Sequence, residues 1–207
     1  MHSTMGSRQI GWCLAMVLLL WGCGSQEFES KAALMAYLRD PGNGYHLTEH
    51  VNGVDYALTY RPTDLLVTQS LSANSSKEEI DSLKTVFGDQ LYFNLSISKA
   101  GKEVLNTFAG NRRQFGAMVN QLAFGLSNKV QLLTAKRDTI AMISHLYPRL
   151  YGMGGGNTIL MAFPRDERLF KGETFQLSVT DLGLGGGKLN FEFKSKAIAN
   201  EPKIKQP

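Results

Sequence analysis

Cysteine is scarce in this sequence, and both copies lie near the N-terminus. Cys13 and Cys23 are the only two cysteines among the 207 residues. A domain that begins after Cys23 therefore cannot contain an internal disulfide bond, and its hydrophobic core has to stabilise it alone. A chain of this length can bury such a core, and one domain, or two small ones, is expected.

An excess of charge of one sign is lacking too. The chain has 22 basic and 18 acidic residues, a formal net charge of +4. Leaving out the first 22 residues removes only Arg8 from this sum, so the rest carries 21 − 18 = +3. A charge this small does not indicate a nucleic-acid partner, and the scattered basic residues are typical of a solvated surface. We expect no nucleic acid to bind.

Long apolar runs are absent as well. The run from Ile10 to Trp21 holds about a dozen residues, whereas a membrane-spanning helix needs roughly 20 apolar residues. No later stretch is long enough either. The run follows the basic side chain of Arg8, and a short apolar segment after a basic residue is the layout of an export signal peptide.

The apolar run ends in the four residues Leu20-Trp21-Gly22-Cys23. They resemble the lipobox of bacterial lipoproteins, although Trp21 departs from the small residue usual at its position. The resemblance implies a lipoprotein signal peptide over residues 1–22 and a palmitate-type acyl group on Cys23 that anchors the protein to a membrane of the cell envelope. Gly24 instead of Asp favours the outer membrane, on its periplasmic or surface face. The alternative is an ordinary signal peptide in which Cys23 has no role.

The residues after the signal peptide show the periodicities of both helices and strands. Apolar residues with helical spacing predict helices at 26–39, 65–71, 80–87 and 111–128. Alternating apolar and polar residues predict strands at 45–51, 54–60, 91–97, 175–179 and 189–193. The apolar-rich stretches 130–134, 139–146 and 158–163 also look like strands. The first two strands should form a hairpin, because Asn52-Gly53 readily adopts the positive φ angles of a two-residue turn.

These elements predict an α+β fold with an N-terminal helix and hairpin, central helices and a C-terminal antiparallel sheet. We expect a single domain over residues 23–198. The segment 199–207 is mostly polar and contains two prolines, which predicts a loose tail.

Two segments of the chain carry a resemblance to known proteins. They read Tyr60-Arg61-Pro62-Thr63-Asp64-Leu65-Leu66 and Tyr147-Pro148-Arg149-Leu150-Tyr151-Gly152-Met153. At both, the sequence is similar to uncharacterised lipoproteins of the Bacteroidota. The resemblance covers most of the chain after Cys23, and it implies no activity.

The stretch His46-Leu47-Thr48-Glu49-His50 matches the H-x-x-E-H pattern of inverted zinc metallopeptidases. In those enzymes both histidines bind zinc from one face of a helix, and the glutamate activates water. Here the residues alternate as a strand, which would place His46 and His50 on one face and Glu49 on the other. Since no third ligand is evident, we expect no bound metal, and nothing indicates another cofactor.

Patterns of nucleophilic catalysis are missing too. G-x-S-x-G does not occur, and the glycine-rich segment 183–188 lacks Walker spacing and joins two predicted strands, which favours a flexible hairpin turn.

The leading hypothesis is therefore a membrane-anchored, non-catalytic binding or assembly module. The alternative is a secreted hydrolase that uses carboxylates brought together by folding, or a zinc site near His46 and His50.

Tyr147, Arg149 and Tyr151 are the candidate contact residues for a partner protein of the envelope. Tyrosine and arginine are enriched at binding surfaces because each combines apolar area with polar donors. The alternative is a structural corner in which Tyr147 and Tyr151 pack into the core.

Overall fold

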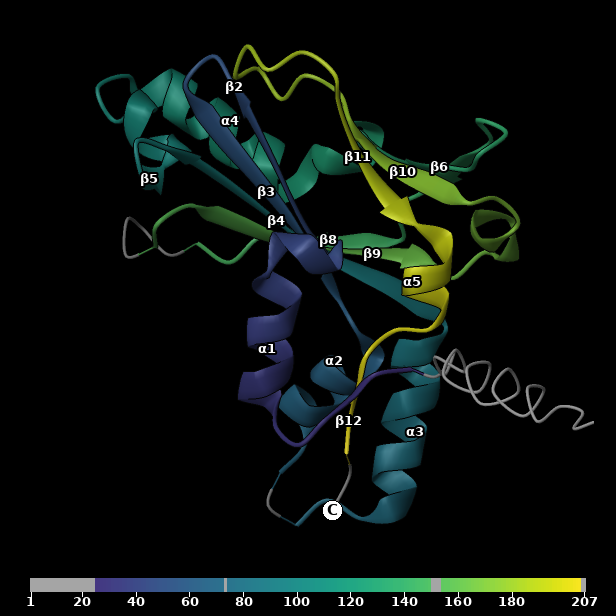
Figure 1. Cartoon of the computed structure of the whole chain (residues 1–207). Helices are drawn as coiled ribbons and strands as arrows, with labels where there is room; N and C mark the ends of the chain where they lie inside the picture. The colour runs from purple at the N-terminus through teal and green to yellow at the C-terminus, as the bar shows by residue number, and fades with distance from the viewer. Residues whose placement is uncertain (1–24, 73, 150–153, 206–207) are drawn as a thin grey trace, which may run out of the picture.

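The computed structural model describes residues 25–72, 74–149 and 154–205. Antiparallel sheets and helices share one fold, which confirms the predicted α+β class (Figure 1). The α-helices are α1 (Lys31–Arg39), α2 (Thr63–Ser70), α3 (Lys77–Gly88), α4 (Arg112–Phe124) and α5 (Ser195–Ala199). Within the described ranges, no helix is both long and apolar enough to cross a bilayer.

The larger sheet has six strands and contains the predicted hairpin. Asn52 and Gly53 take φ angles of 52° and 75° in its turn, as expected. The strands lie in the order β2, β3, β4, β9 and β8, all antiparallel, with the short β5 beside β4. Their bounds are His46–Val51, Val54–Arg61, Gln90–Lys99, Asn157–Pro164 and Ser144–Leu146, and β5 is Lys102–Glu103.

The smaller sheet has four antiparallel strands in the order β11, β10, β6 and β7. Their bounds are Leu189–Lys194, Thr174–Val179, Val130–Leu133 and Thr139–Ala141. The predicted strand 139–146 is in fact two strands, because the chain leaves this sheet after Ala141 and joins the larger sheet at Ser144. The strand near 158–163 likewise belongs to the larger sheet.

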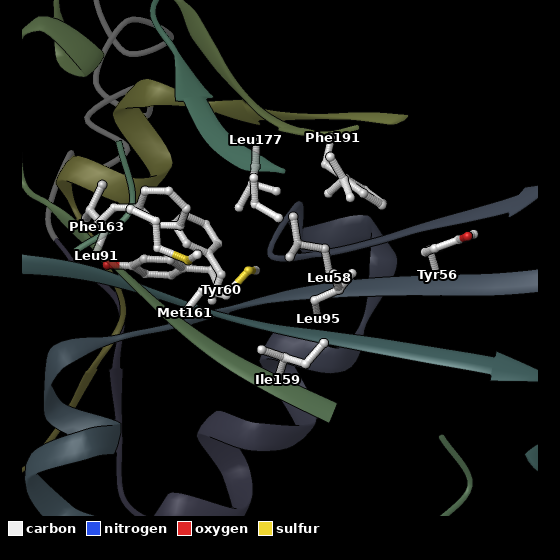
Figure 2. Packing of buried hydrophobic residues seen from close by; sticks show 14 of the residues in the cluster. Tyr56, Leu58, Tyr60, Leu91, Leu95, Ile159, Met161, Phe163, Leu177 and Phe191 are labelled. Carbon is white, nitrogen blue, oxygen red and sulfur yellow. The ribbon is translucent and has the colours of Figure 1, made fainter. Parts of the chain in front are cut away.

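The two sheets pack face to face over a common hydrophobic core. Leu58 and Leu95 of the larger sheet point toward Leu177 and Phe191 of the smaller one (Figure 2), and all four are at most 2% exposed. Since side chains alternate along a strand, the neighbours of these core residues in β3 and β4 face the opposite side. That outer face of the larger sheet carries mainly polar side chains.

Helix α1 lies on the outer side of the larger sheet, where α2 and α3 also gather (Figure 1). The Ser30 hydroxyl accepts a hydrogen bond from the Ala33 N–H at 3.2 Å and so fixes the start of α1. The helix therefore begins later than the predicted residue 26, and the short strand β1 (Glu27–Phe28) precedes it. Leu34 and Leu38 attach its inner face to the core.

The expectation of a loose tail at 199–207 is wrong for the described part of that segment. Strand β12 (Lys203–Ile204) pairs in parallel with β1, and Ile204 is only 8% exposed. The backbone N–H of Ile204 also donates to the Asp64 carboxylate at 3.0 Å. Burial of Ile204 and pairing with β1 hold this segment in place. Its polar composition alone suggests a loose tail.

Candidate functional site

A groove lies between α1 and the outer face of the larger sheet. Its volume is about 430 Å³, within the range of roughly 300–1,000 Å³ typical of small-molecule sites. The helix supplies part of the wall, and strands β2, β3, β4 and β9 supply polar side chains. The lining includes Met35, Leu38 and Arg39 of α1, and His46, Ala57, Thr59, Arg61, Asn94, Ser96 and Thr158 of the strands.

Strand register brings the polar side chains of the groove together. Thr59 lies opposite Asn94, and Ser96 lies opposite Thr158. The same alternation that buries Leu58 and Leu95 directs these hydroxyl and amide groups outward. For Asn94 and Ser96, the sequence signal is the polar residue at every second position of 91–97, which does not by itself indicate a groove.

The ionised lining side chains of the groove are basic. Arg61 Nη2 donates to Gln69 Oε1 at 2.9 Å, whereas the buried Arg61 Nε has no partner within the described part of the chain. Burial lowers the pKa of the Arg61 guanidinium, and the nearby charge of Arg39 lowers it further. No ion pair among residues 25–72, 74–149 and 154–205 includes either arginine. No described carboxylate therefore compensates the positive charge of these two groove residues.

The predicted orientation of the two histidines is confirmed. His46 and His50 lie opposite Thr59 and Asp55, whereas Glu49 lies opposite the inward-facing Tyr56. His46 Nδ1 is 2.8 Å from the Thr59 hydroxyl inside the groove, and His50 Nδ1 is 2.6 Å from the Asp55 carboxylate at an exposed position. Among the described residues, no group of three or more His, Cys, Asp or Glu side chains is placed to hold a metal ion.

The predicted contact residues divide between core and surface. Tyr147 packs partly buried against the core, and its hydroxyl accepts a hydrogen bond from Asn157 Nδ2 at 3.0 Å. The same amide donates to the buried Glu103 carboxylate at 3.2 Å. Arg149 is exposed and lines a smaller hollow of about 150 Å³ with Phe115 of α4. The structural corner thus fits Tyr147, while the surface interpretation fits Arg149; Tyr151 and Cys23 lie outside the described residues.

Glu201 belongs to a polar cluster that the sequence analysis missed. Its carboxylate accepts hydrogen bonds from the Tyr60 hydroxyl and from the Thr63 N–H at the start of α2, and it pairs with Arg165 at 3.2 Å. Burial, followed by the charge of Glu201, raises the pKa of Tyr60 well above its ordinary value. These contacts attach the segment before β12 to the fold, so this carboxylate is engaged in structural bonds.

Comparison with known proteins adds little to this description. No family model and no curated protein matches the chain. A crystal structure of a DUF4426 family protein from Pseudomonas aeruginosa is similar to it, with 10% sequence identity and a TM-score of 0.36, over 72% of this chain and 94% of that chain. At this level of similarity we infer neither fold nor activity from that protein.

Proposed function

We propose that the protein is a membrane-anchored lipoprotein of the bacterial cell envelope that acts as a non-catalytic binding module. Lipid on Cys23 provides the anchor, as the lipobox resemblance at residues 20–23 implies, and Gly24 favours the outer membrane. The groove beside α1 holds the ligand. The groove is the observation that carries this proposal, because one helix and four strands contribute polar side chains to a hollow of ligand size.

The groove favours binding over catalysis because its hydroxyl and its base, Thr59 and His46, lack a third group among the described residues that orients the base. His46 Nδ1 and the Thr59 hydroxyl lie within hydrogen-bond distance. An activated nucleophile generally also needs a third group that orients the base. No described carboxylate bonds to His46, and the carboxylates of Asp64 and Glu201 accept bonds from backbone N–H groups elsewhere.

A substitution that fills the groove tests the proposed function. Ala57 is half-buried on the groove floor, and Ala57→Trp would place an indole in the space of the ligand. Asn190→Trp is a matched control at an exposed position of β11. We expect native protein extracted from membranes to carry a small molecule detectable by mass spectrometry in the wild type and the control, and to lose it in Ala57→Trp. The same small molecules in all three proteins, or none in any, would contradict the proposal.

Contact with another envelope protein is a second candidate function. Ile143 and Leu146 are 55% and 63% exposed, and Leu146 belongs to β8, which forms one edge of the larger sheet. They precede the exposed Arg149 by only a few residues. Exposed apolar side chains beside an arginine are common features of protein-binding surfaces.

A further inference from the structure

We propose that the groove binds a small organic anion, with its carboxylate or phosphate group held between Arg39 and Arg61. This inference names the ligand class of the groove and rests on the proposed binding function. Two guanidinium groups line the groove, and the described side chains that form its wall include no carboxylate to neutralise them.

Electrostatics favour an anion at this position. A partly buried cation is costly unless an opposite charge compensates it, and a second cation nearby adds to the cost. Arginine stays protonated in proteins, so Arg61 cannot relieve this cost by losing its proton. An anionic group placed between the two side chains would compensate both charges at once.

Hydrogen bonding leads to the same ligand group. Gln69 accepts from Arg61 Nη2 and so fixes the guanidinium in the groove wall, while no hydrogen bond to a described residue occupies Arg61 Nη1. Arg39 lies in the last turn of α1 and its side chain is exposed. A planar guanidinium presents paired donors that match the oxygens of a carboxylate or phosphate.

The other side chains that line the groove indicate the chemistry of the uncharged part of the ligand. Thr59, Asn94, Ser96 and Thr158 present hydroxyl and amide groups, whereas Met35 and Leu38 add apolar surface from α1. Hydroxyl and amide groups bind polar substituents, and apolar side chains pack against carbon atoms. The combination fits a hydroxyl-bearing acid or phosphate monoester of the size of a sugar.

Calorimetric titration of the full-length protein in detergent tests this inference. The probes are glucose 6-phosphate and gluconate, which are anions that carry hydroxyl groups. Inorganic phosphate represents the charged group alone, and glucose is the uncharged sugar. We expect both organic anions to bind, inorganic phosphate to bind more weakly, and glucose not to bind. Tighter binding of phosphatidylglycerol vesicles than of the soluble anions would contradict a free ligand and indicate a lipid headgroup.

Arg39→Gln and Arg61→Gln locate the bound charge, and Arg112→Gln is their control. Arg39→Gln removes an exposed side chain and should weaken anion binding roughly tenfold or more, the effect of losing a hydrogen bond to a charged group. Arg112→Gln makes the same charge change at the start of α4, outside the groove, and should leave affinity unchanged. Because Arg61 contributes to the wall, Arg61→Gln is interpreted only with an unchanged circular dichroism spectrum.

The results that would contradict the anion assignment differ from those that would contradict the proposed binding function. Absence of anion binding up to millimolar concentration, or equal affinity in Arg39→Gln and Arg112→Gln, would overturn the anion assignment. A neutral small molecule retained by the wild type and lost in Ala57→Trp would overturn it too, while leaving the proposed binding function in place.

Discussion

Tyr147 and Arg149 are two residues apart, yet they have different surroundings. The Tyr147 hydroxyl bonds to Asn157 and its ring packs against the core, whereas the side chain of Arg149 is exposed beside a hollow. A residue type enriched at interfaces therefore does not decide between surface and core. The exposure of Arg149 makes it the residue at which partner contact can be tested without disturbing the fold.

Arg149→Ala should weaken capture of an envelope partner roughly fivefold or more, the size of an energetically important contact. Crosslinking and pull-down from native membranes would measure capture. Thermal melting should change little, because an exposed arginine contributes little to stability. Tyr147→Phe is the contrasting variant, since loss of the hydrogen bond to Asn157 should lower the melting temperature. A large fall in the melting temperature of Arg149→Ala would show that Arg149 stabilises the fold instead.

At the scale of elements, the Glu201 carboxylate is one of the groups that hold the C-terminal segment. Glu201→Gln keeps an acceptor for the Thr63 N–H but removes the charge that pairs with the half-buried Arg165. We expect a loss of about 1–3 kcal/mol in the free energy of unfolding, typical of a charged group deprived of its partner. Denaturant titration would measure it. Glu29→Gln is the control, because its ion pair with Lys205 is exposed and should contribute little; equal losses in the two variants would refute a special role for Glu201.

Elements with a clear period or turn signal were predictable from the sequence. The hairpin around Asn52-Gly53 and the strand over 91–97 are two of them. Strands β1 and β12 were missed because two-residue strands have no measurable period. The segment 139–146 is predicted as one strand because apolar residues run through its middle without a break, whereas its pairing partner changes from β6 to β9.

The groove was less predictable than the fold. The H-x-x-E-H pattern draws attention to His46 only as a zinc ligand of the alternative hydrolase, and no sequence signal pairs His46 with Thr59. Arg39 and Arg61 lie 22 positions apart in the sequence (61 − 39 = 22) and approach each other only because α1 lies against β3. Sequence periodicity gives the face on which a side chain lies, but it does not give which helix covers that face.

At the scale of the whole molecule, the proposed function combines a groove for a ligand with a lipid anchor at the cell envelope. A single domain over residues 23–198 stays a prediction; among the described residues, one hydrophobic core cluster contains side chains from both sheets. The segment between Cys23 and the first described residue is very short, so lipid on Cys23 would hold the domain close to the membrane surface. On this proposal, the anchor would determine where the groove can meet its ligand.

Membrane fractionation of the Cys23→Ala variant tests this central claim most directly. Without the cysteine, no acyl group can be attached, so the protein should leave the outer-membrane fraction and appear in the soluble fraction. Cys13→Ala is the control, because Cys13 lies within the predicted signal peptide and its loss should leave the anchor intact. Recovery of the Cys23→Ala protein in the membrane fraction at the level of wild type would contradict the account.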